Sequence, residues 1–365
     1  MTSTRKPWLL KDSLIYVLFL LLPMCVYYAC ASHVLGRHGL GVKIYWADWI
    51  QSYGTMMVIF GIGAGVSGVW AIKLRLTEKE RLDKIWLRIV RPYATPRLFL
   101  RAMVIMVVDT FLIVVYLSLK QFTPILNDML FDDALIAMDR AIHFGIDPYP
   151  AWILPFPPMV GLIQTLYIGW FGLKIPIFAY YLFKPTAKSV HFFASYFLLF
   201  VLAGSLAVVF PSLGPVYVIP HEQVDAIRAD TTTEVTQKAA LQWYWKAIQD
   251  PYNYERNPIG GLAAFPSLHV GMVALMTIFF CRMRRLRWVS LVYLVIIEFG
   301  SVYLGWHYAL DGYFTILFTL ILVWALGLAL EKVSGERMLN PIQELIRMVR
   351  KMFGREHKAA DEHSR

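Results

Sequence analysis

The sequence predicts an all-α fold, a polytopic membrane helix bundle of about eight transmembrane helices. Three observations lead to this prediction. Of the 365 residues, 58% are hydrophobic and only 16% are charged, whereas soluble domains carry roughly a quarter charged residues. Segments of about 20 mostly apolar residues, the length that crosses a bilayer as a helix, recur along the whole chain. Lys and Arg gather in alternate connecting loops, as in the cytoplasmic loops of membrane proteins.

Eight segments are apolar enough to cross a bilayer as helices. In chain order they are Ser13–Leu35, Tyr53–Ile72, Leu98–Leu119, Pro158–Phe183, Val190–Phe210, Ser267–Cys281, Trp288–Leu304 and Gly312–Leu330. The sixth is the shortest. The first resembles a signal peptide, but its apolar stretch exceeds the usual 7–15 residues of such a region. We therefore expect it to be an uncleaved anchor.

The distribution of charge orients these spans. Basic residues precede the first span and follow the second, fourth, sixth and eighth, which places both termini in the cytoplasm. The other loops are poor in Lys and Arg, and the loop after the third span carries several aspartates, Asp128, Asp132, Asp133, Asp139 and Asp147. These loops are expected on the non-cytoplasmic side. The formal charge of +10 thus reflects orientation in a membrane rather than a nucleic-acid partner.

The spans suggest one membrane domain in three parts. Residues 1–97 form a two-span extension with a basic cytoplasmic loop, 98–330 a six-span core, and 331–365 an amphipathic basic tail. Loop 120–157 is acidic and ends in a proline-rich stretch from Pro148 to Pro158, which suits a non-helical or re-entrant segment. Loop 211–265 carries aromatic residues suited to the lipid headgroup level. All three cysteines fall inside spans, so no disulfide framework or thiolate metal site is predicted.

Two histidine-containing segments lie at the non-cytoplasmic ends of spans, residues 264–269 and 305–311. His307 and Asp311 are four residues apart, so on a helix they share one face. The carboxylate is then placed to bond one ring nitrogen and leave the other as a nucleophile. His269 would serve as a general acid for the leaving oxygen. Alone, each group would be taken for an interfacial residue, but the charge pattern places all three on one side of the membrane.

Helix polarity adds a second argument. The sixth and eighth spans both begin on the non-cytoplasmic side, and helix N-termini bind phosphate through free N–H groups and the helix dipole. Ser267, just ahead of the sixth span, is placed to cap that helix or to donate to a phosphate oxygen. The sequence therefore predicts an anion site beside these two helix starts.

The run Phe265-Pro266-Ser267-Leu268-His269, followed about forty residues later by His307-Tyr308-x-x-Asp311, resembles two signature motifs of the type 2 phosphatidic acid phosphatase superfamily. It is most similar to the branch that contains fungal inositol phosphorylceramide synthase, an inositolphosphotransferase of sphingolipid metabolism. Residues 137–145 also resemble the segment before the core of such proteins, and the likeness extends to about residue 330.

This resemblance implies a six-helix phosphatase-like core and a reaction that needs no metal or other cofactor. It implies that His307 is the nucleophile that becomes a phosphohistidine, that Asp311 orients it, and that His269 protonates the departing alcohol. The partners would be a lipid donor and a lipid or polyol acceptor.

Two departures separate the chain from the phosphatase branch. Ser301 stands where that branch has an arginine six residues before the third-motif histidine, and the first motif, a lysine followed by Arg-Pro, has no clear counterpart near Pro211–Pro215. Another cation must then balance the phosphate. Arg256 and Arg140 are the first candidates and are expected to bind substrate together with Ser267; Arg228 and Lys246 follow, and each could instead be a solvated loop charge.

The leading hypothesis is a membrane lipid phosphotransferase that moves a phospho-headgroup between lipids on the non-cytoplasmic side. The alternative enzyme is a lipid phosphate or lipid pyrophosphate phosphatase, in which water resolves the same intermediate. A transporter or scaffold is the alternative of another class, suggested by Asp109, Lys174 and Glu298 inside spans, where a charge costs roughly 2.5–3.5 kcal/mol. We expect these three to pair and hold helices together, with Glu298 near enough to support the His307 loop.

Overall fold

The described part of the protein is an all-helical bundle. The computed structural model describes the chain from Pro7 onward except for most of 45–94, and for 149–156, 220–230, 253–260, 348–349 and 351–365. The helices are α1 (Pro7–Tyr16), η1 (Val17–Leu21), α2 (Leu22–Gly36), α5 (Pro96–Leu126), α6 (Asp132–Ile142), α7 (Pro157–Leu182), α8 (Thr186–Val209), α9 (Pro215–Val218), α11 (Thr231–Gln249), α12 (Leu268–Phe280), α13 (Arg284–Tyr303) and α14 (Ala309–Ser334).

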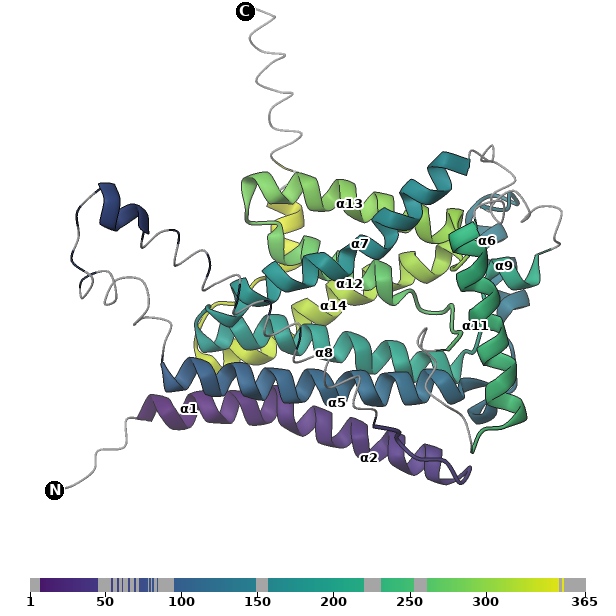
Figure 1. Ribbon diagram of the computed structural model, residues 1–365, viewed down its shortest axis with the longest axis horizontal. Helices are drawn as coiled ribbons and strands as arrows, with labels where there is room; N and C mark the ends of the chain where they lie inside the picture. The colour runs from purple at the N-terminus through teal and green to yellow at the C-terminus, as the bar shows by residue number, and fades with distance from the viewer. Residues whose placement is uncertain are drawn as a thin grey trace, which may run out of the picture.

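The long helices run side by side, and α8 lies in the middle of the bundle between α5 and α14 (Figure 1). The chain from α1 through η1 to α2 forms one membrane-length helix that packs against α5, while α7 and α13 cover the other side of α12. Small residues permit the closest approaches. A Cβ atom on Gly271 of α12 would lie 2.4 Å from Thr315 of α14, so glycine there lets the two helices touch.

The predicted spans agree closely with the observed helices. Within the described residues, six helices are long and apolar enough to cross a membrane: Asp12–Gly36, Leu98–Leu126, Val160–Leu182, Thr186–Val209, Leu286–Tyr303 and Ala309–Ser334. The predicted sixth span is the shorter apolar helix α12, whose 13 residues rise only about 20 Å. The second span, Tyr53–Ile72, falls largely outside the described residues.

The two long loops that the charge pattern predicts on the non-cytoplasmic side contain helices of their own. Loop 120–157 contains α6, and loop 211–265 contains α9 and α11. These three helices gather at one end of the bundle (Figure 1). In α6, residues Asp132, Leu135 and Asp139 are buried, because their i, i+3, i+7 spacing places them on one face. The proline-rich run that suggested a non-helical segment lies after this helix.

The tail returns to the opposite end of the bundle. Residues 341–347 are helical, and Glu344 accepts from Arg282 at 2.9 Å and from Arg347 at 2.7 Å. Ile342, Leu345 and Ile346 are exposed on this helix, in keeping with the expected amphipathic character.

Candidate active site

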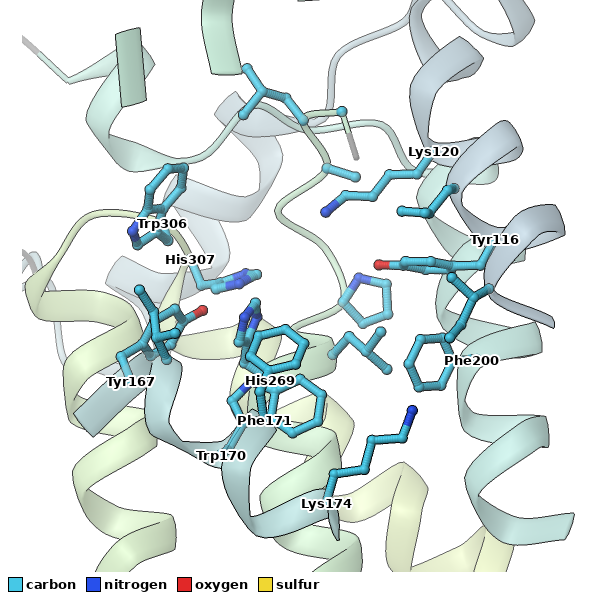
Figure 2. Close-up of a pocket in the computed structure, with 18 of the residues that line it drawn as sticks. Tyr116, Lys120, Tyr167, Trp170, Phe171, Lys174, Phe200, His269, Trp306 and His307 are labelled. Atoms are coloured by element: carbon cyan, nitrogen blue, oxygen red, sulfur yellow. The ribbon is translucent and has the colours of Figure 1, made fainter. Parts of the chain in front are cut away.

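A cavity of about 560 Å³ lies between α5, α7 and α8 at the start of α12. The α7 residues that line it include Gln164, Tyr167, Phe171 and Lys174, which repeat at helical spacing along one face. Figure 2 shows His269 and His307 side by side in this cavity, with Lys120 and Lys174 at opposite ends. The two histidine segments identified in the sequence therefore meet at one space.

The His269 side chain stands in an aromatic cage. Its ring stacks on Tyr167 with centroids 4.5 Å apart, and it meets the edges of Trp170 at 5.6 Å and Phe171 at 5.9 Å. His269 is the second residue of α12, so the helix start fixes its backbone. Because aromatic faces surround the ring, its rotation is restricted and it is presented to the cavity.

The His307 ring is oriented chiefly by a backbone group. Its Nδ1 lies 2.7 Å from the Ala264 carbonyl oxygen and 3.3 Å from Asp311 Oδ2. Both partners accept hydrogen bonds, so Nδ1 carries the proton and Nε2 keeps its lone pair. Burial lowers the pKa of His307 to about 3, opposed by the Ala264 carbonyl and assisted by the positive charge of Lys120. The imidazole is therefore neutral at physiological pH, as a nitrogen nucleophile requires.

His269 and His307 face each other with ring centroids 6.3 Å apart. Asp311 lies behind His307, fully buried, and its Oδ2 also accepts from the backbone N–H of Tyr308 at 3.0 Å. The carboxylate was expected to be the main partner of the imidazole. The Ala264 carbonyl oxygen is a second and closer partner of Nδ1. Sequence reasoning did not find it, because any residue type can supply a backbone carbonyl.

Asp132 of α6 ties the loops of the site together. Its Oδ1 accepts from the Tyr308 hydroxyl at 2.6 Å and from the Gly214 N–H at 2.9 Å, and both carboxylate oxygens lie 3.0 Å from the Leu213 N–H. The backbone at Gly214 has φ of +108° and passes so close to Trp306 that a Cβ atom there would lie 2.6 Å from its carbonyl oxygen. Asp132 thus locks the 212–214 segment onto the His307 loop.

Asp139 of α6 caps the N-terminus of α14. Its carboxylate accepts from the N–H groups of Ala309 at 2.9 Å and Leu310 at 2.8 Å, and Asp311 accepts from Tyr308. These carboxylates occupy the donors that were expected to bind phosphate at this helix start, so that expectation is wrong for α14. The start of α12 differs, since the Ser267 side chain makes no capping bond there.

Removal of this cap gives a test of positioning. Asp139→Ala leaves two buried N–H donors without partners, and we expect a loss of about 2–3 kcal/mol in stability together with slower turnover, because the loop that holds His307 loses its anchor. Thermal unfolding in detergent micelles and turnover of a lipid phosphate measure the two effects. The exposed neighbour Asp133 provides the matched control, and equal effects of Asp133→Ala and Asp139→Ala would contradict the role.

Among the described residues two lysines line the cavity, and Lys120 is the one whose charge acts on both His269 and His307. Its ammonium group points towards the His307 side of the cavity (Figure 2). Arg140 instead forms a bidentate pair with Asp147 at an exposed position and is not among the residues that line the cavity. Arg256 lies outside the described residues. Sequence reasoning missed Lys120 because the third apolar segment was ended at Leu119, just before this charge, whereas α5 continues to Leu126.

Ser267 occupies the N-cap position of α12. Its side chain is fully buried, and its hydroxyl has no hydrogen-bond partner among the described residues. A buried hydroxyl without a partner costs free energy unless a ligand or water satisfies it. This hydroxyl remains the candidate donor to a phosphate oxygen that the sequence suggested.

Two of the three charges predicted inside spans do pair. Lys174 Nζ lies 3.2 Å from Asp109 Oδ2, joining α7 to α5. Glu298 does not join them. Its carboxylate fills the space at Gly312, and neither oxygen has a hydrogen-bond partner among the described residues. Since Gly312 follows Asp311 directly, Glu298 packs beneath the start of α14, where it was expected to support the site.

Comparison with known proteins supports the resemblance to the superfamily and assigns no branch within it. The searches of curated proteins and of solved structures each found no match. The sequence matches the PAP2 superfamily over residues 133–325, just over half of the chain, from the start of α6 to within α14. That range contains both histidines, Asp311 and Asp139, and it begins one residue after Asp132. The chain belongs to the PAP2 superfamily.

Proposed function

We propose that the protein is a membrane lipid phosphotransferase that passes a phospho-headgroup between lipids through a phosphohistidine on His307. One observation carries this proposal. The His307 Nδ1 atom is held by the Ala264 carbonyl at 2.7 Å, so Nε2 is the nucleophilic nitrogen. The same cavity contains His269, 6.3 Å away between ring centroids, and Lys120. Membership of the superfamily suggests lipid phosphatase or phosphotransferase-type activity.

The geometry supports a two-step transfer. The His307 Nε2 lone pair attacks phosphorus, the bond from phosphorus to the leaving alcohol oxygen breaks, and His269 gives that oxygen a proton. In the second step the acceptor hydroxyl gives its proton to His269 and attacks phosphorus, and the bond from phosphorus to nitrogen breaks. Lys120 balances the charge on the phosphoryl oxygens throughout. Asp311 and the Ala264 carbonyl stabilise the positive charge that develops on His307.

Two features favour transfer over hydrolysis. Ser301 is fully buried and its hydroxyl donates within α13 to the Glu298 carbonyl, so no cation stands at the position where the phosphatase branch has arginine. The cavity walls are largely apolar, with aliphatic and aromatic side chains, and lie among helices long and apolar enough to span a membrane. Such a wall limits the water that reaches the phosphoenzyme, which favours an alcohol acceptor.

A non-cytoplasmic location of the site fits the charge pattern of the loops.

The alternative is a lipid phosphatase of the same superfamily, which would use the same histidines. Product partition separates the two. Purified protein in nanodiscs receives a fluorescent phosphatidylinositol, with or without a lipid alcohol such as ceramide or diacylglycerol. We expect consumption of the donor to depend on the added alcohol and to yield a new fluorescent or phosphorylated lipid. Equal release of the water-soluble phosphate product with and without the alcohol would establish hydrolysis instead.

A further inference from the structure

The cavity has a second polar end that the proposed chemistry does not use. Lys174 lines it at the end opposite Lys120 (Figure 2). Asp109 also lines the cavity and lies 3.2 Å from the Lys174 ammonium group. On α5, Asp109 is 11 residues before Lys120, which corresponds to about 16 Å along the helix. On α7, Lys174 is one turn beyond Trp170 and Phe171, the residues that contact His269. The ion pair thus lies about 5–10 Å deeper in the membrane than the histidines.

The pair retains unused hydrogen-bonding capacity. Lys174 Nζ has three N–H donors, yet among the described residues it contacts only Asp109, at 3.2 and 3.5 Å, and the faces of Phe178 and Tyr196. The side chains of the pair are only 13% and 6% exposed. Buried ion pairs within membrane spans are costly and point to a function by default.

The Trp170 side chain at this end also lacks a partner. Its indole N–H is buried and makes no hydrogen bond among the described residues, and Trp170 lines the cavity. Trp170 is 2% exposed, and Tyr196, whose hydroxyl interacts with Asp109, is fully buried. Buried polar atoms are nearly always hydrogen-bonded in folded proteins, so an unsatisfied N–H beside a buried ion pair in the cavity wall indicates a polar ligand group.

We infer that Asp109, Lys174, Trp170 and Tyr196 form a subsite for a free hydroxyl group in the backbone of the lipid substrate. The inference rests on the proposed function, since it names the substrate class of the same cavity. A lipid whose phosphate lies between the histidines extends its backbone towards the membrane interior, which brings a hydroxyl near the ion pair. That hydroxyl donates to Asp109 and accepts from Lys174 or Trp170. An unsubstituted chain would leave these groups unsatisfied, and the site therefore discriminates against it.

Matched lipids test the subsite. The probes are lysophosphatidate, which has a free hydroxyl next to its phosphorylated carbon, and its 2-deoxy analogue, which lacks only that hydroxyl. Binding to the protein in phosphatidylcholine nanodiscs is measured in the His307→Ala background, so turnover does not interfere. We expect the hydroxyl lipid to bind about 10-fold more tightly, the value of one hydrogen bond to a charged group. Equal binding of the two lipids would overturn the inference.

The variants separate recognition from folding. Replacing one partner would leave a buried charge, so Asp109→Leu and Lys174→Met are combined to remove both. Trp170→Phe keeps an aromatic ring but removes the indole N–H. We expect each variant to bind the deoxy lipid as the parent does and to lose the preference for the hydroxyl. Lys184→Met, outside the cavity, is the matched lysine control and should retain the preference. A preference that survives both cavity variants shows that the ion pair is only structural.

The binding test of the hydroxyl subsite can be judged separately from the proposed phosphohistidine mechanism. If phosphohistidine formation fails while the hydroxyl preference is present and lost in the variants, the subsite stands and the proposed function falls. If wild-type protein turns over both lipids without preference, the proposed function stands and the subsite falls. The binding comparison uses only variants whose melting temperature, measured in the same nanodiscs, is close to that of the parent. If the double variant unfolds, Trp170→Phe alone tests the subsite.

Discussion

Replacing His307 with alanine is expected to abolish phosphoryl transfer, with a loss of about 10³-fold or more. The alanine side chain supplies no nitrogen to attack phosphorus, and no other nucleophile is held by the Ala264 carbonyl and Asp311. The measurement is headgroup transfer by purified protein, together with acid-labile labelling of the protein by a radioactive phosphate donor. The label should be present in the wild type and absent from the variant.

A control is needed because the His307 ring also contributes to packing. His307→Gln preserves much of the side-chain volume without an imidazole nucleophile, and His33→Ala changes an exposed histidine of α2 far from the cavity. We expect His33→Ala to retain transfer, whereas His307→Gln should be inactive with a melting temperature near that of the wild type. Full transfer by either His307 variant would rule out the phosphohistidine mechanism.

Replacing His269 with alanine should slow transfer from a lipid phosphate by about 10²–10⁴-fold. The departing lipid alkoxide is a strong base and needs a proton as the bond to phosphorus breaks. Nitrophenolate is a stable leaving group that needs none, so nitrophenyl phosphate should be affected much less. The ratio of the two losses, measured as kcat/KM on the same preparation, reports general acid catalysis. A His269→Ala variant equally impaired with both substrates would show that this ring only positions the phosphate.

The spans could be predicted from sequence because a bilayer imposes a length and an apolarity on every crossing. The same rule explains what was missed. Lys120 was placed outside the third span because its charge ended the apolar window, but the residue lines a cavity inside the bundle and α5 continues past it. The short α12 was also predicted, since its limits are set by the motif at one end and Cys281 at the other.

The site could be predicted only where its side chains form a recognisable sequence motif. His269, His307 and Asp311 were brought together as expected. Asp132 and Asp139 looked like loop charges because their partners lie some 170 residues away in the chain; a contact at such separation has no local periodicity that would reveal it. Arg140 carried the right charge but lies beside Asp147, which neutralises it locally.

The anchoring of α14 by α6 also constrains biosynthesis. The loop that carries His307, the proposed nucleophile, is held by Asp139 of the loop helix α6, several helices earlier in the chain. The N–H groups that donate to this aspartate belong to the first residues of α14. A nascent chain that has inserted every helix but the last therefore lacks a positioned His307. Under the proposed mechanism, catalytic competence is gained only when α14 has inserted, so we expect incompletely inserted chains to be inert towards the surrounding lipid.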